Sequence, residues 1–370
     1  MYGWIQKEIK LGTVTLKNRV VFAPTSMGLK EEAYIQKLSS IAKGGVGLII
    51  IGDVSVMPSR GVCLHTEEGF AYYQRVVEAV HKYGAKVCAQ LHMSDSNFAA
   101  LAKYIPDVKQ GKISEQQLRV LLNQEVSPYI TNMPIEMVQK IIKGFGTTAL
   151  LAKKAGFDLV QIHGDRMCGS FSSPIFNKRT DKYGGSLENR IRFAKEAIEE
   201  VRKAVPNDAI DFKLAVRMED PHYGNAGITV EEIKTVVPVL EQAGVTSFHV
   251  TLANHSDLQD TIPPKNHPYF KEEGCFLDFC DEVKKYTKLP VCGVGALRTP
   301  KFIEEQLRTQ RIDMVGMCRQ LIADPEWVNK IKQEKEENIQ YCIRCNQKCL
   351  GGIQAHVGVH CIYDKKRLEE

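Results

Sequence analysis

The chain has 370 residues, of which 44% are hydrophobic and 25% are charged, so it can bury a core and lacks the composition of a disordered protein. Its net charge is only +5 and its basic residues are scattered, which disfavours nucleic-acid binding. Residues 1–10 contain no apolar run of signal-peptide length, and no stretch approaches the roughly 18 apolar residues of a membrane span. We therefore expect a cytoplasmic protein without membrane partners.

Short β-branched runs alternate with longer amphipathic stretches along the chain, a pattern typical of βαβ units. Most of the short runs are continuously apolar, as expected for parallel strands that are covered on both faces. The predicted strands are Val20–Ala23, Gly47–Ile51, Lys86–Gln90, Leu159–His163, Phe212–Arg217, Ser247–Thr251, Pro290–Val294 and Met314–Met317. Helical patterns lie between them at Phe70–Tyr83, Glu136–Ala155, Ser186–Ala204, Val230–Ala243 and Lys301–Thr309. Eight such repeats predict a TIM (β/α)8 barrel over residues 1–335, with a doubly wound sheet as the alternative.

Two segments depart from this repeat. Residues 94–134 form a long polar insertion after the third strand, predicted to be partly helical around Ser114–Gln124. In a barrel this connection lies on the C-terminal face, where active sites are built, so the insertion is either a lid, a pocket wall or a purely structural excursion. Residues 336–370 follow the last barrel helix and are rich in Cys and Gly, so we expect a separate metal-binding segment there.

Four of the eleven cysteines lie in that C-terminal segment. They are Cys342, Cys345, Cys349 and Cys361. Four thiolates at this spacing can hold one iron–sulfur cluster or one zinc ion, and the spacing alone does not choose between them.

Polar and ionisable residues follow the fourth predicted strand, in the sequence His163-Gly-Asp165-Arg166. Catalytic residues of TIM barrels collect at the C-terminal ends of strands, so this density of charge favours a functional loop over a merely solvated one.

The loops after the seventh and eighth strands predict a second site. Gly293 and Gly295 follow the seventh strand, and Cys318 and Arg319 follow the eighth. In TIM barrels these two loops frequently form a phosphate site from backbone N–H groups, to which an Arg adds bidentate recognition.

Several motifs together resemble the Old Yellow Enzyme family over almost the whole chain. They are Leu16-Lys-Asn-Arg-Val-Val-Phe-Ala-Pro24, Gln90-Leu-His, Ser173-Pro174, Arg179-Thr-Asp-Lys-Tyr-Gly-Gly-Ser186 and Ala323-Asp-Pro325. The Cys-x-x-Cys-Asn-Gln-x-Cys tail resembles the branch that contains 2,4-dienoyl-CoA reductase, 2-enoate reductase and trimethylamine dehydrogenase. The resemblance implies bound FMN, and a [4Fe-4S] cluster rather than zinc.

The resemblance also implies a set of FMN contacts. Pro24 and Thr25 would meet the flavin near N5 and O4, and Gly52 would lie beneath the ring. Gln90 would bind the pyrimidine edge, and Arg217 would lie near N1 and O2, where a cation stabilises reduced flavin. The phosphate would be held by Gly295, Ala296, Cys318 and Arg319, with Cys318 acting through its backbone because the family usually has Gly there.

The family pattern is altered where substrate would bind. His163 is kept, but Arg166 replaces a polar partner and Cys168 replaces the tyrosine that donates a proton, so the usual acid is lost. Asp165 and Arg166 are the obvious replacements, and His255, which matches an active-site His of the dienoyl-CoA reductases, is a second acid candidate. The neighbouring Arg opposes a protonated carboxyl, which favours His255 as the donor and Asp165 as the residue that orients Arg166.

The His-Gly-Asp-Arg variant resembles the bilirubin reductases of anaerobic gut bacteria. It implies reduction of bilirubin toward urobilinogen by hydride from FMN, with Arg166 binding propionates. Alternatives are a 2-enoate, 2,4-dienoyl-CoA or 3-ketosteroid reductase, or a non-catalytic FMN and iron–sulfur electron-transfer subunit. The tail contains no Gly-x-Gly-x-x-Gly motif, so we expect electrons from a separate flavodoxin-like protein or, inefficiently, from NAD(P)H.

Overall fold

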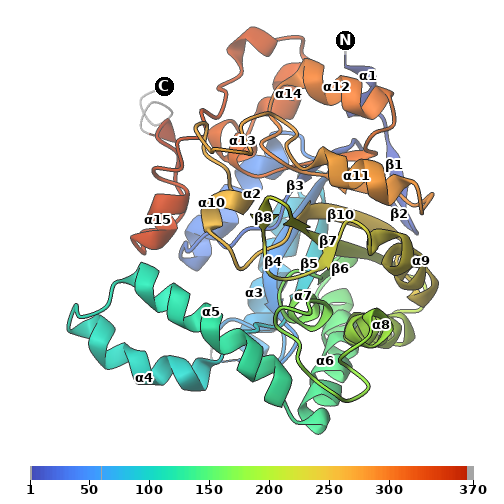
Figure 1. Cartoon of the computed structure of the whole chain (residues 1–370). Coiled ribbons are helices and arrows are strands. Elements are labelled where there is room, and N and C mark those ends of the chain that lie inside the picture. The colour runs from blue at the N-terminus through green and yellow to red at the C-terminus, as the bar shows by residue number, and fades with distance from the viewer. Residues whose placement is uncertain (1, 60, 365–370) are drawn as a thin grey trace.

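The computed structural model describes residues 2–59 and 61–364, and its centre is a barrel of eight parallel strands surrounded by helices (Figure 1). Neighbouring strands pair around the ring, and pairing of β12 with β3 and of β7 with β10 closes it. The barrel strands are β3 (Val20–Phe22), β4 (Leu48–Ser55), β5 (Lys86–His92), β6 (Leu159–His163), β7 (Ala209–Glu219), β10 (Ser247–Leu252), β11 (Val291–Gly293) and β12 (Met314–Met317). The closed ring confirms the predicted TIM barrel and rules out an open doubly wound sheet.

An outer layer of amphipathic helices covers the barrel. In α8, Ser186 caps the first turn by accepting the N–H of Asn189, and Ile191, Ala194 and Ile198 share the buried face. Among the described residues, no helix combines the length and the apolarity needed to cross a membrane. The outer helices are α2 (Glu31–Lys43), α3 (Glu67–His81), α6 (Ile135–Lys154), α8 (Leu187–Ala204), α9 (Ile233–Ala243), α11 (Leu277–Lys284), α12 (Pro300–Arg308) and α14 (Trp327–Lys332).

A hairpin that the sequence pattern did not predict closes one end of the barrel. Its strands β1 (Ile9–Leu11) and β2 (Val14–Leu16) are antiparallel, and Leu11 and Leu16 pack with the first residues of β4 and β6. Strands of three residues are too short to produce a readable alternation. The remaining short elements are α1 (Gly3–Gln6), α7 (Met167–Ser172), β8 (His222–Tyr223), β9 (Ile228–Thr229), α10 (Leu258–Thr261), α13 (Arg319–Ala323), a 3-10 turn (Glu336–Asn338) and α15 (Leu350–Gln354).

The insertion after β5 is more helical than predicted. It forms α4 (Phe98–Lys109) and α5 (Glu115–Asn132), which project beside the barrel in Figure 1. A capping box between Ser114 and Gln117 starts α5. The other end of α5 is fixed to the loop after β6, because Arg179 donates from Nη1 to the carbonyl of Ile130 at 2.8 Å.

The cysteine-rich segment lies across the C-terminal face of the barrel. The Arg344 guanidinium donates to the carbonyls of Phe270 at 2.7 Å and Pro264 at 2.9 Å. The Val359 N–H donates to the carbonyl of Met27 at 2.7 Å, in the loop that follows β3. These contacts bring the four cysteines next to the barrel mouth.

Candidate active site

A chain of buried polar side chains crosses the barrel interior. Gln90 donates from Nε2 to Gln161 at 2.6 Å, and Gln161 donates to the carboxylate of Asp211 at 2.6 Å. Ser247 donates to the other oxygen of Asp211 at 2.5 Å. Burial raises the pKa of Asp211 to about 6. The amide of Gln90 is thus fixed by its neighbour on β6.

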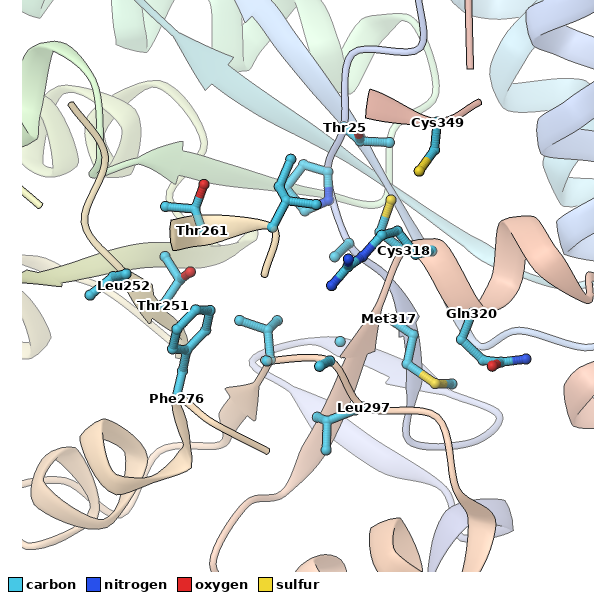
Figure 2. Close-up of a pocket in the computed structure, with 18 of the residues that line it drawn as sticks. Thr25, Thr251, Leu252, Thr261, Phe276, Leu297, Met317, Cys318, Gln320 and Cys349 are labelled. Carbon is cyan, nitrogen blue, oxygen red and sulfur yellow. The ribbon is translucent and has the colours of Figure 1, made fainter. Parts of the chain in front are cut away.

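Above this layer lies a cavity of about 260 Å³ that reaches from the barrel interior to the cysteine-rich segment (Figure 2). It brings together residues that the sequence places in separate loops after β3, β6, β11 and β12. Figure 2 shows the Cys318 side chain beside Thr25 and directed toward Cys349. The predicted site residues that line this cavity are Pro24, Thr25, Asp165, Gly295, Ala296, Cys318, Arg319, Cys342 and Cys349.

Three predicted flavin contacts do not line this cavity. Gly52 lies directly behind its wall, since a Cβ added there would be 3.3 Å from the backbone nitrogen of Thr25. Gln90 is in the polar layer below. Arg217 donates from Nη1 to the Gly227 carbonyl at 2.6 Å and from Nε to Glu219 at 2.8 Å, so local carbonyl and carboxylate groups hold its guanidinium.

Lys213 is the cation that β7 brings to the cavity, and the sequence predictions missed it. Burial lowers its pKa, while the carboxylate of Asp165 acts in the opposite direction. His249 lines the cavity beside it, and its buried Nδ1 has no hydrogen-bond partner within the described part of the chain. A lysine at a position of the strand that alternates with buried apolar residues was the signal available in the sequence.

Of the two predicted proton donors, the structure brings Asp165 to the cavity. Its Oδ1 accepts the backbone N–H of Asn254 at 2.8 Å. Cys168, at the position of the family tyrosine, is fully buried, and burial raises the pKa of its thiol well above the usual range. The thiol is therefore a poor acid, as predicted.

His163 lies in a compact cluster at the ends of three neighbouring strands. Its Nδ1 is 2.9 Å from Nδ1 of His92 and 3.9 Å from the carboxylate of Asp53. Burial lowers the pKa of His163 well below its ordinary value, and the nearby Lys213 acts in the same direction. His163 is thus a neutral imidazole at neutral pH, and within the described residues its buried Nε2 has no partner.

His255 lies beside this loop, not in the cavity wall. Its Nε2 is 2.7 Å from the carboxylate of Asp95, and its Nδ1 is 3.1 Å from Oδ1 of Asn123. The guanidinium of Arg166 is 4.0 Å from the same carboxylate. Both nitrogens of His255 are therefore engaged, so it could donate to a substrate only by breaking one of these contacts.

The four cysteines of the C-terminal segment line one small second cavity, which Arg319 also lines. A tetrahedral zinc site, with Zn–S bonds of about 2.3 Å, holds its sulfurs about 3.8 Å apart. Within the part of the chain that the structure describes, no three of these thiols lie within 4.8 Å of one another. The four thiols thus share a cavity without the close packing of a tetrahedral zinc site.

Comparison with known proteins places this geometry in context. The profile of the NADH:flavin oxidoreductase / NADH oxidase family matches residues 5–338. Bilirubin reductase from Clostridium symbiosum (strain WAL-14163) is 54% identical over 369 residues, which cover 99% of both chains. Bilirubin reductase from Mediterraneibacter gnavus (strain CC55_001C) is 33% identical over 96% of this chain, which spans 55% of that protein.

A solved structure shares the same fold. The complex of 2-naphthoyl-CoA reductase with 2-naphthoyl-CoA superposes with a TM-score of 0.78 at 22% identity. The match covers 98% of this chain and 57% of the other. The chain thus spans all of one relative and about half of the longer ones.

Proposed function

We propose that this chain reduces the conjugated double bonds of bilirubin toward urobilinogen. The chain belongs to the NADH:flavin oxidoreductase / NADH oxidase family. The resemblance to flavin-dependent Old Yellow Enzymes expected from the sequence is confirmed, and the chain is an oxidoreductase. The observation that carries the proposal is one cavity that joins six of the nine predicted flavin contacts with Asp165 and two of the four cysteines. The 54% identity to a bilirubin reductase supports this substrate.

The residues of the cavity fit FMN. Gly295 has φ +119°, and a Cβ there would lie 2.9 Å from the Phe276 nitrogen. Only glycine therefore fits at this position of the loop after β11. Arg319 adds a cation for the phosphate, and Lys213 and the unpaired Nδ1 of His249 provide polar groups for the ring. FMN held by these residues would supply the hydride chemistry that reduces an activated double bond.

The residues of the loop after β6 prepare the substrate. His163 offers an unpaired Nε2, and Arg166 offers a guanidinium that binds a propionate or polarises a lactam carbonyl. We assign the proton transfer to Asp165 rather than to His255, because Asp165 lines the cavity and both nitrogens of His255 are engaged. This assignment reverses the preference drawn from the sequence.

The cysteine segment is proposed to hold a [4Fe-4S] cluster through Cys342, Cys345, Cys349 and Cys361. The support is the cavity that the four cysteines share and the resemblance of their spacing to the iron–sulfur branch of the family. The chemistry that such a group supplies is one-electron transfer, and Cys342 and Cys349 line the flavin cavity as well. We propose that a separate flavodoxin-like protein supplies the electrons and that NAD(P)H does so poorly.

The test is anaerobic reduction of bilirubin by the purified protein loaded with FMN and iron–sulfur. After chemical reduction of the protein, added bilirubin should bleach and gain hydrogens by mass spectrometry. Replacing Arg166 by Met should slow bleaching severely, to a residual but measurable rate, while replacing the exposed Arg308 by Met should not change it. These results would support the site after β6.

Other outcomes would redirect the proposal. Reoxidation of the reduced flavin by an enoate, a dienoyl-CoA or a ketosteroid, but not by bilirubin, would keep the reductase and replace the substrate. A flavin that no alkene reoxidises would indicate an electron-transfer subunit. Turnover with NAD(P)H alone at the rate seen with a donor protein would contradict the proposed electron supply.

A further inference from the structure

Asp95 begins the insertion, and its carboxylate is completely buried beneath the loop that carries Arg166. Its Oδ2 accepts the hydroxyl of Ser170 at 2.6 Å and contacts Nε2 of His255 at 2.7 Å. Its Oδ1 has no hydrogen-bond partner in the described part of the chain, and the Arg166 guanidinium lies 4.0 Å from it. One carboxylate thus contacts two loops of the candidate site.

A buried carboxylate must be compensated by nearby positive charge and hydrogen bonds. The groups that act on Asp95 come from four elements: His255 after β10, Arg166 after β6, His92 at the end of β5 and Tyr129 on α5. His255 and Arg166 hold the pKa of Asp95 well below its usual range, so the carboxylate is charged at neutral pH. Removing the charge would leave both partners without their common anion.

His255 connects this carboxylate to the insertion. Its Nδ1 contacts Asn123 on α5, and its ring packs edge-on against Phe176 with the centroids 5.1 Å apart. Ser127, one turn further along α5, donates to the Phe176 carbonyl at 2.9 Å. His255 also has φ +66°, a left-handed conformation that costs energy in a non-glycine residue and is kept only where the surroundings require it.

We propose that Asp95 is the positioning residue of the substrate-binding face. It holds the Arg166 guanidinium in one orientation and, through His255 and Asn123, fixes α5 against that face. Asp95 is completely buried, whereas 31% of the Arg166 side chain is exposed, so Asp95 acts through Arg166 and does not touch substrate. The role of Arg166 rests on the proposed function, whereas the contact between Asp95 and His255 does not.

The test uses Asp95→Asn in the protein loaded with FMN and iron–sulfur. Asn keeps the shape and a hydrogen-bond acceptor but removes the charge. Flavin reoxidation at saturating bilirubin should slow by about 10- to 100-fold, with KM changed less than about threefold, because orientation and not binding is lost. In an Arg166→Met background the same replacement should cost less than about threefold, because the group that Asp95 positions is already absent.

A second readout needs no turnover. With ¹⁵N-labelled histidine, the Nε2–H signal of His255 should appear far downfield, and Asp95→Asn should shift or remove it, as His255→Gln does. The matched control is Asn132→Ala, an exposed Asn at the other end of α5, which should change neither rate nor signal.

Two results would overturn the inference: a rate within threefold of wild type in Asp95→Asn, or an equal loss in both backgrounds. If Asp95→Asn does not fold, Ser170→Ala and Asn123→Ala each remove one contact of the Asp95–His255 pair. Rates within twofold of wild type in both would then overturn it. A wild-type protein that reduces no alkene would refute the proposed function, while the histidine signal would still test the Asp95 contact.

Discussion

Replacing Asp211 by Asn should make the protein more stable at pH 8. The carboxylate is buried in the barrel with Gln161 and Ser247 as its partners, and burial raises its pKa from 3.8 to about 6. A group whose pKa is raised on folding stabilises the fold when protonated. Its contribution is therefore complete below about pH 4 and is lost as the pH rises through about 6.

The size of the effect follows from the two pKa values. A difference of about two corresponds to about 3 kcal/mol at pH 8. Unfolding entropy of about 2.1 cal/mol/K per residue converts this, for a chain of this length, to a rise of about 4 °C in the unfolding midpoint. Asn cannot ionise but still accepts the hydrogen bond from Gln161, so it should recover most of this free energy.

The assay is thermal and urea unfolding at pH 5 and pH 8, followed by tryptophan fluorescence. The free energy of unfolding of the wild type, relative to that of Asp211→Asn, should be lower at pH 8 than at pH 5. Asp208→Asn, which removes a carboxylate paired with Lys153 at 2.7 Å near the surface, should leave the wild-type pH dependence intact. A midpoint for Asp211→Asn below that of wild type at pH 8, or an unchanged pH dependence, would refute the reasoning.

Three further predictions concern the cofactor sites. Gly295→Ala should weaken FMN binding at least tenfold in a fluorescence titration, because the added Cβ meets the Phe276 nitrogen at 2.9 Å and φ is +119°. Lys213→Met should lower the flavin midpoint potential in spectroelectrochemistry, because a cation at the cavity stabilises the reduced anion, and an unchanged potential would contradict this role. Cys342→Ser should lose most of the bound iron by metal analysis while FMN content is kept. Cys318→Ser, the matched control, should retain the iron.

The barrel could be predicted because most of its strands are nearly continuous apolar runs. The bounds of β6 and β12 agree with the sequence pattern, and the other six barrel strands overlap their predicted ranges. A strand covered on both faces is apolar at most positions, so the requirement is visible in the sequence alone. The positions of Asp165, Gly295 and Arg319 followed from the same pattern, because each comes directly after a strand that ends at the cavity.

The sequence by itself thus determined the order of strands and helices, the loops that reach the cavity and the grouping of four cysteines, since all of these depend on local spacing. The tertiary structure decided which side chains meet. Lys213 and Arg217 lie on one face of β7, because they are four residues apart. The pairing register places Lys213 beside His163 of β6 and His249 of β10. Arg217 lies further along the strand, where it binds the Gly227 carbonyl. The burial of Asp95 between two loops likewise depends on how distant segments pack, because nothing in the residues around position 95 encodes the positions of Arg166 and His255.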